Sequence, residues 1–239
     1  MSGGEAIVSS LLANGVDTVF GIPGAQTYPI FDALARVQSK VRTVGSRHEQ
    51  GAAYMAFGYA KSTGKPGVYS VVPGPGILNT MAALCTAWGA NVPVLCVTGQ
   101  VPREAMGKLR GHLHELPDQI ATLETLTKWS VRIDRPSDAP EIINEAFRVM
   151  CSGRPGPVLV DIPKDILNEE SDWIEPKIVE MPGYKPTTIP NPKSISEAAK
   201  LLKEAKKAVL YVGGGVISSK SNKELFELAT STKIPVVTT

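Results

Sequence analysis

The stretch RHEQGAAYMAFGYAKSTGKPGVYSVVPGPG, residues 47–76, contains the pattern that decides the fold. Residues 49–62 are rich in Ala, Met, Phe and Tyr and predict a helix, and Gly-Lys-Pro-Gly at 64–67 predicts a turn. Residues 68–72 form a short, mostly apolar run that predicts a strand, and Pro-Gly-Pro-Gly at 73–76 ends it. A strand that is apolar on both faces and lies between two helices is typical of a parallel sheet.

The same alternation of apolar runs and helical segments extends in both directions from this stretch. It predicts an α/β fold, in which a parallel sheet carries helices on both faces. Residues 100–128 are less regular. The predicted strands cover residues 18–22, 41–46, 68–72, 92–98 and 158–162, and the predicted helices cover residues 4–13, 27–38, 49–62, 77–90 and 138–151.

The chain divides into two predicted domains. The first covers residues 1–168, and residues 169–192 have no periodicity, contain five of the 19 prolines and predict a linker. Residues 193–239 begin a second α/β unit, with helices at 194–206 and 222–230, strands at 208–212 and 234–239, and a loop at Gly213, Gly214 and Gly215. Because this second unit has few strands for a parallel sheet, we expect it to be incomplete and the chain to be a fragment.

The composition excludes several classes of protein. The 239 residues are 43% hydrophobic and 20% charged with a net charge of +2, and no cationic run predicts a nucleic-acid partner. No apolar stretch is long enough for a membrane span, and the N-terminus does not resemble a secretory signal. We interpret Cys85, Cys96 and Cys151 as buried free thiols of a cytoplasmic protein. No His or Cys cluster has the spacing of a metal site, so we predict no metal ligands in this chain.

Two features could carry chemistry, and each has a simpler alternative. The glycines around Pro75 and at 213–215 lie between a predicted strand and a helix, where backbone N–H groups can bind an anion or a polar ring. Asn79 and Ser218 occupy the third glycine position of the dinucleotide fingerprint, so plain turns are the alternative. Burial of Glu49 would favour a neutral carboxyl, whereas a helix N-terminus favours the anion; a group balanced in this way suits acid–base catalysis. A solvated first-turn glutamate is the alternative.

Several motifs in order resemble the thiamine diphosphate enzymes of the acetohydroxyacid (acetolactate) synthase family. The likeness covers nearly the whole chain, with the first domain similar to the pyrimidine-binding domain and the second to the start of the central domain. The motifs are GVDTVFGIPG (15–24), RHEQGAAYMAFGYAKSTGKPGV (47–68), PGPGILNTMAAL (73–84), PVLCVTGQVPR (93–103), GRPGPVLVDIPKDI (153–166) and LYVGGGV (210–216).

The resemblance implies a role for individual residues. Glu49 matches the glutamate that bonds the aminopyrimidine ring of the cofactor and so activates its thiazolium carbon. Gly24 and Ala25 match a Gly-Gly pair beside the reacting centre, and Pro75, Gly76 and Asn79 match the turn and helix start that pack on the ring. Gln26 and Lys164 match positions at the substrate end. Arg154 and the glycines Gly213, Gly214 and Gly215 match a site for FAD, which is a possible second cofactor. Mg²⁺ and the diphosphate would be bound by a domain that this chain lacks.

The chain departs from the family pattern in EAMGKLRGHLHELPDQ, residues 104–119, where His114 stands in place of a glutamine that reaches the active site. The resemblance therefore implies a carboligase or lyase that acts on 2-oxo acids, with a 2-oxoacid decarboxylase or a benzaldehyde lyase-like enzyme as alternatives. It also implies a homodimer or a higher homo-oligomer formed through the pyrimidine domain. The sequence contains no Gly-Asp-Gly motif, so we expect the chain to be inactive alone. A non-enzymatic interaction module or a subunit awaiting a diphosphate-binding partner remains the third possibility.

Overall fold

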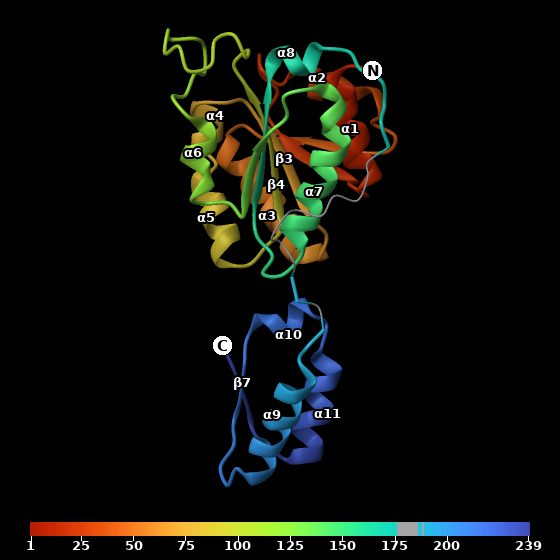
Figure 1. Ribbon diagram of the computed structural model, residues 1–239, viewed down its shortest axis with the longest axis vertical. Coiled ribbons are helices and arrows are strands. Elements are labelled where there is room, and N and C mark those ends of the chain that lie inside the picture. Colours follow the sequence, from red (N-terminus) through yellow and green to blue (C-terminus); the bar gives the residue numbers. More distant parts are fainter. Residues whose placement is uncertain (176–185, 188) are drawn as a thin grey trace. The chain divides into compact units, whose positions relative to one another are not determined.

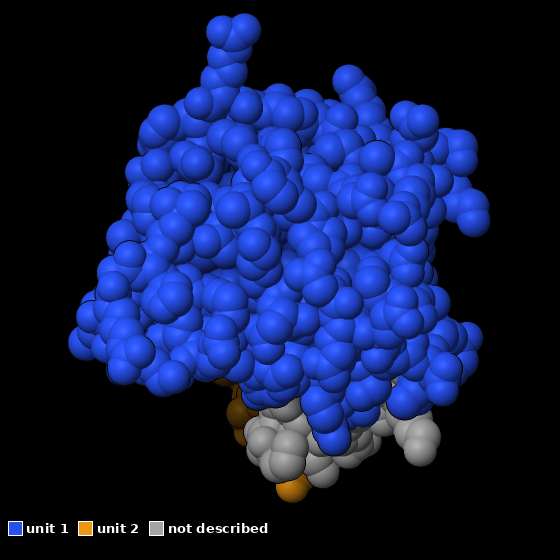
Figure 2. Space-filling view, turned by 90° about the horizontal axis from the view of Figure 1, so that it is seen from above, with its two compact units in different colours: residues 1–186 blue, residues 187–239 orange. Residues whose placement is uncertain are grey.

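The computed structural model describes residues 1–175, 186–187 and 189–239. The chain forms two compact units, Met1–Pro186 and Thr187–Thr239, which are coloured separately in Figure 2. Residues 176–185 and 188 of the predicted linker lie outside the described residues. The first described residues of that linker pair with the N-terminus, since Gly3 N donates to Glu169 O at 2.9 Å. The predicted domain limits at 168 and 193 remain predictions.

Unit 1 is built on a sheet in which six strands are described and every neighbouring pair is parallel, as the sequence predicts. Every residue of its β3, β4 and β6 is buried, so these strands have helices over both faces. In spatial order the strands are β2 (Arg42–Gly45), β1 (Thr18–Gly21), β3 (Gly67–Val71), β4 (Val94–Gln100), β6 (Val158–Pro163) and β5 (Trp129–Arg132).

Two apolar clusters hold the helices against the two faces of the sheet (Figure 1). One face carries α1 (Gly3–Ala13), α2 (Tyr28–Arg36), α7 (Ala139–Cys151) and α8 (Lys164–Asn168). The other face carries α3 (Glu49–Thr63), α4 (Pro75–Leu78), α5 (Met81–Gly89) and α6 (Gln119–Glu124). A short 3₁₀ turn at Pro136–Asp138 leads into α7. The core is therefore two apolar layers separated by the sheet, which confirms the predicted fold class.

The helix predicted over 77–90 is divided into α4 and α5 at Thr80. The buried Thr80 hydroxyl donates to Ile77 O at 2.7 Å and accepts from the Tyr69 hydroxyl at 2.9 Å. These bonds give the break its own polar partners inside the core. The pattern analysis also missed β5, α6 and α8: β5 is a half-buried edge strand, and the other two are short helices.

Unit 2 contains α9 (Pro192–Glu204), β7 (Leu210–Val212), α10 (Gly214–Ser218), α11 (Asn222–Thr232) and β8 (Val236–Thr238), and its two strands pair in parallel. None of its described residues, 187 and 189–239, is buried. The prediction of a loop over Gly213, Gly214 and Gly215 was wrong at its end, because α10 begins at Gly214. Glycine is a poor helix former, which is why the sequence favoured a loop there.

The prediction of three buried thiols was correct only for Cys96, since Cys85 and Cys151 are exposed, although all three are free. Cys85 lies on α5 and Cys151 ends α7. A cysteine in an amphipathic helix can face either way, so apolar sequence neighbours did not fix its side. No helix among the described residues is long and apolar enough to cross a membrane.

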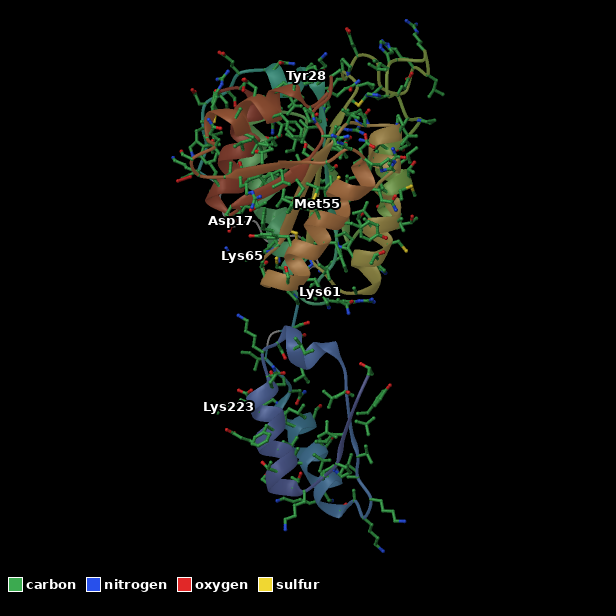
Figure 3. All side chains as sticks on the ribbon, turned by 180° about the vertical axis from the view of Figure 1, so that it is seen from behind. Asp17, Tyr28, Met55, Lys61, Lys65 and Lys223 are labelled. Atoms are coloured by element: carbon green, nitrogen blue, oxygen red, sulfur yellow. The ribbon has the colours of Figure 1, made fainter. Side chains whose placement is uncertain are left out.

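A polar cluster closes the amino-terminal edge of the sheet in unit 1. Lys65 Nζ donates to Asp17 Oδ2 at 2.6 Å, and the Tyr59 hydroxyl donates to Asp17 Oδ1 at 2.5 Å. The hydrogen bonds from Lys65 and Tyr59 lower the pKa of Asp17 to about 2. Asp17 and Lys65 lie at the end of unit 1 away from Tyr28 (Figure 3). Since both carboxylate oxygens have partners, this cluster ties the start of β1 to the loop before β3.

A substitution at Gly67 can test how closely α3 packs on the sheet. A Cβ atom at Gly67 would lie 2.1 Å from the backbone oxygen of Ala56, so Gly67→Ala should force α3 away and lower the free energy of unfolding by about 3 kcal/mol. Gly58, in the middle of α3, has no such neighbour within 4 Å, and Gly58→Ala should raise stability by about 0.5–1 kcal/mol.

Urea unfolding followed by tryptophan fluorescence measures both variants, because Trp88, Trp129 and Trp173 all lie in unit 1. A Gly67→Ala variant within about 0.5 kcal/mol of the original chain would contradict this packing.

Candidate functional site

The strand order places a topological switch point at the carboxyl ends of β1 and β3, the place where open α/β sheets have a crevice. The chain passes from β1 to β2 on one side and returns to form β3 on the other side of β1. The loops that follow β1 and β3 therefore leave the sheet in different directions, and ligands of open α/β sheets bind at such switch points. Gly24, Ala25 and Gln26 lie in the first of these loops, and Pro75 and Gly76 lie just after the second strand.

The two loops meet on one side chain, Val72. A Cβ atom at Gly24 would lie 2.3 Å from Val72 Cγ1, and one at Gly76 would lie 2.5 Å from Val72 Cγ2. Both glycines therefore pack closely on Val72, and a larger residue at either position would require the valine or the backbone to move. The result is a surface of backbone atoms at the mouth of the crevice, next to the half-buried Ala25 and the exposed Pro75.

Glu49 is the first residue of α3, directly after its N-cap His48, whose Nδ1 accepts from Gln50 N at 3.2 Å. Asn79, the C-cap residue directly after α4, donates from Nδ2 to Glu49 Oε2 at 2.9 Å. Glu49 Oε1 would lie 3.8 Å from a Cβ at Gly76, and among the described residues no hydrogen-bond partner of Oε1 is found. One carboxylate oxygen is thus oriented and the other is available next to the glycine surface.

The expectation that Glu49 is buried was wrong for the single chain, since its side chain is half-exposed. The apolar residues that follow Glu49 do face the core, for example Ala52, Ala53 and Ala56. The first turn of α3, however, extends to the rim of the sheet, so the helix can be buried while its first carboxyl is not.

Gln26 and His114 are brought together although 88 residues separate them. Gln26 is buried, donates from Nε2 to Leu113 O at 2.8 Å, and presents Oε1 to His114 Nδ1 at 2.9 Å. With this amide orientation Oε1 can only accept, which assigns the proton to Nδ1 and leaves Nε2 of the imidazole as an acceptor. His114 has φ +66°, and its carbonyl oxygen lies 2.5 Å from a Cβ placed on Gly74. The loop 104–119 therefore packs on the glycine turn of the crevice.

A buried polar group that the motif analysis missed lies behind this turn. Gln119 Oε1 accepts from Gly74 N at 3.1 Å, and Gln119 Nε2 donates to Asp161 Oδ1 at 2.8 Å and to Gly99 O at 3.1 Å. Arg132 Nε donates to Asp161 Oδ2 at 2.7 Å. Burial raises the pKa of Asp161 to about 6, against the charge and hydrogen bond of Arg132. A single Asp in the otherwise apolar strand VLVDIP, residues 158–163, was the available sequence signal.

The remaining predicted residues do not join the crevice at Glu49. Lys164 begins α8 and lines a separate cavity of about 500 Å³ with Pro102 and Asp165. Arg154 lies in the loop before β6, at the amino-terminal edge of the sheet, where its guanidinium stacks 5.7 Å from the Trp88 ring and donates to Asn91. The glycines at 213–215 belong to unit 2.

Two family descriptions match the chain. The one that reads "Thiamine pyrophosphate enzyme, N-terminal TPP binding domain" matches residues 1–122, just over half of the chain. The one that reads "Thiamine pyrophosphate enzyme, central domain" matches residues 195–239. The parallel sheet with a crevice at its switch point thus has the architecture of a cofactor-binding α/β domain. The chain belongs to the thiamine pyrophosphate enzymes.

Curated relatives narrow the likeness to one group within this family. An acetolactate synthase of Arthrospira platensis is 44% identical over 243 residues, which cover all of this chain and 42% of the relative. An acetolactate synthase large subunit of Corynebacterium glutamicum is 44% identical and is covered to 38%, and a probable one of Methanocaldococcus jannaschii is 41% identical and is covered to 40%. The chain spans about two fifths of the length of these relatives.

Val72 and Gly76 should show energetic coupling. Gly76→Ala should lower the free energy of unfolding by about 1–3 kcal/mol, because its Cβ would overlap Val72 Cγ2. Val72→Ala removes that methyl group, so the double variant should lose less than the sum of the single losses, with a coupling of about 1 kcal/mol or more. Urea unfolding of the four proteins measures this cycle.

Gly89→Ala, which meets no atom within 4 Å, should be additive with Val72→Ala. Additivity in both cycles would refute the close approach at Val72.

Proposed function

We propose that this chain supplies the half of a thiamine diphosphate site that activates the aminopyrimidine ring, in a carboligase of the acetolactate synthase type. The observation that carries the proposal is the pair formed by Glu49 and Asn79 beside Gly76. One carboxylate oxygen is held by an amide, and the other lies next to Gly76, which carries no side chain of its own. A flat ring that needs an acid at one of its nitrogens fits this arrangement.

In this proposal the protein residues divide the work at the cofactor. Glu49 would hold or release a proton at Oε1 for a ring nitrogen of the cofactor, while the amide of Asn79 orients the carboxyl through Oε2. Gly24, Ala25 and Gly76 allow the backbone to approach the ring and the reacting centre, and Pro75 starts the helix that carries Asn79. The bound cofactor would supply a nucleophilic carbon that no side chain provides.

The substrate end of the site is assigned to Gln26 and His114, with a 2-oxo acid as the substrate. His114 Nε2 can exchange a proton with a substrate oxygen because Gln26 holds the other ring nitrogen. Lys164 lines a separate cavity, and its proposed place at the substrate entrance rests on the resemblance. The His114–Gln26 pair also supports a second candidate function, that of a 2-oxoacid decarboxylase. After loss of carbon dioxide, a decarboxylase adds a proton and releases an aldehyde, whereas a carboligase adds a second oxo acid.

A second copy of the chain is the proposed partner, through α3 and α5. Exposed aromatic side chains lie on both helices, Tyr54 with 38% and Trp88 with 40% of its surface accessible, and Tyr54 is hydrogen-bonded to Thr86 at 3.0 Å. Met55 is also on α3 (Figure 3). A partner on this face would cover Glu49, which begins α3, and remove its carboxyl from water.

The remaining parts of the proposal rest on the resemblance. Mg²⁺ and the diphosphate would be held outside this chain, and among the described residues no group of three or more His, Cys, Asp or Glu side chains could hold a metal ion. FAD is a proposed second cofactor, for which the resemblance implies Arg154 in unit 1 and the glycines at 213–215 in unit 2 as separate candidate contacts. The stacking of Arg154 on Trp88 gives that arginine a role in holding α5 as well. The cytoplasm is the proposed compartment, supported by three free thiols.

Glu49→Gln tests the assignment in the longest natural protein that contains this chain, assayed with pyruvate, thiamine diphosphate and Mg²⁺. Loss of the acidic proton should lower turnover by about 10²–10⁴-fold. Glu141→Gln makes the same change in the first turn of α7 and should leave turnover unchanged. Acetolactate as the product supports the carboligase and acetaldehyde the decarboxylase. Full activity of the Glu49→Gln protein would refute the role of Glu49.

A further inference from the structure

Gln119 connects three separate segments of unit 1 with one side chain. Its amide contacts the Gly74 turn after β3, the carbonyl of Gly99 in β4 and the carboxylate of Asp161 in β6. Only 1% of Gln119 is exposed, and both amide atoms have partners. Residues 45 and 42 positions away in sequence are thus held by a single planar group.

The Gly74 turn has little freedom apart from this contact. Gly74 has φ +58° and ψ −121°, a backbone conformation that L residues rarely adopt, and a Cβ there would lie 2.5 Å from His114 O. Gly74 is also the residue from which α4 starts. Because α4 is one turn long and Asn79 is its C-cap, a rotation at Gly74 would move the amide that holds Glu49.

The orientation of the Gln119 amide follows from its neighbours. Gly74 N is a donor, so Oε1 must face it, whereas Gly99 O and the ionised Asp161 Oδ1 are acceptors that require Nε2. In a flipped amide, Nε2 would face the Gly74 N–H donor, and Oε1 would face the two acceptors, Gly99 O and Asp161 Oδ1. Asp161 therefore selects the orientation in which Gly74 has a partner, and protonation of Asp161 at Oδ1, the oxygen that does not face Arg132, would remove one of the two acceptors that do so.

Asp161 is placed to change its charge in the neutral range. Its pKa is raised to about 6 by burial, and Arg132 on β5 opposes that shift with a charge and a hydrogen bond. On β4, Gln100 donates a hydrogen bond that also favours the anion, and the Cys96 thiol is buried with its pKa raised mainly by burial. Among the described residues, Arg132 and Cys96 are the charged and titratable groups found to interact with Asp161.

We propose that Gln119, oriented by Asp161, is a positioning residue that fixes the Gly74 turn and through α4 the Asn79–Glu49 pair. The catalytic meaning of this role rests on the proposed function of Glu49, but the structural coupling does not. Gln119 and Asp161 touch neither the crevice surface nor Glu49, so they would act through Gly74.

Nuclear magnetic resonance of the ¹⁵N-labelled 239-residue chain, without cofactor, tests the coupling. The Gly74 amide signal should shift with pH about a midpoint near 6, and this response should disappear in Asp161→Asn. In Gln119→Met, which keeps the shape and removes the acceptor, the Gly74 amide should exchange with solvent about tenfold faster. Gln38→Glu, at an exposed glutamine, should leave the Gly74 signal unchanged.

The double variant Gln119→Glu/Asp161→Asn provides the rescue. It exchanges donor and acceptor between the two side chains, keeps their summed charge and restores an acceptor for Gly74 N, but it leaves Gly99 O without its donor. The Gly74 signal should therefore return part of the way toward its original position, without the midpoint near 6. A Gly74 signal that ignores pH between about 5 and 7 in the original chain would overturn the link to Asp161. That measurement needs no variant to fold. Unchanged exchange at Gly74 in a folded Gln119→Met chain would overturn the role of Gln119.

The effect of Gln119 on catalysis is measured in the longest natural protein that contains this chain. Gln119→Met should lower kcat about tenfold and leave KM for pyruvate within about twofold, since substrate contacts are retained while the Glu49 carboxyl is displaced. Combined with Glu49→Gln, it should lower kcat no further. Equal kcat values for Gln119→Met and the original enzyme would overturn the catalytic part. If Glu49→Gln alone is fully active, the proposed function fails while the Gly74 measurements still decide the coupling.

Discussion

The crevice depends on the close approach of two backbones to Val72. Gly24 and Gly76 pack against the two γ-carbons of this side chain so closely that a Cβ atom on either glycine would overlap with them. Because Val72 directly follows β3, the strand determines the position of the valine. The valine in turn determines how closely the loops after β1 and β3 can approach each other. The glycine surface is therefore a product of the buried central strands. Any change that moves β3, such as a larger residue at Gly67 against α3, would reach the crevice through the same contact.

Behind the Gly74 turn, the site is supported by a layer of buried polar groups. Asp161 is fully buried, and its carboxylate oxygens contact Arg132 and Gln119. Burying a charge is costly unless it is paired and hydrogen-bonded, so this arrangement makes sense only with all its partners present. The network ties β4, β5, β6 and the Gly74 turn together at the carboxyl edge. It leaves the crevice surface itself to backbone atoms and to Glu49.

The loop 104–119 connects these two layers. Its His114 carbonyl packs on Gly74, its His114 ring contacts Gln26, and its last residue is Gln119. This is also the segment in which the chain departs from the acetohydroxyacid synthase pattern. A change in this loop would therefore reach both the neighbouring loop at Gln26 and the Gly74 turn.

The sequence by itself determined the parallel α/β fold and the strands from 18–22 to 158–162, because apolar runs, helical periodicity and glycine turns are local patterns. The family followed from the resemblance of its motifs. The sequence also indicated Glu49, Gly76 and Asn79 through the resemblance. Only the tertiary structure decided that Cys85 is exposed, that β5 forms an edge and that Glu49 is half-exposed in the single chain. It alone joined Gln26 to His114 and Gln119 to Gly74 and Asp161. Hydrogen bonds between residues 42 to 88 positions apart follow from how the strands are ordered, and no periodicity along the chain encodes that order.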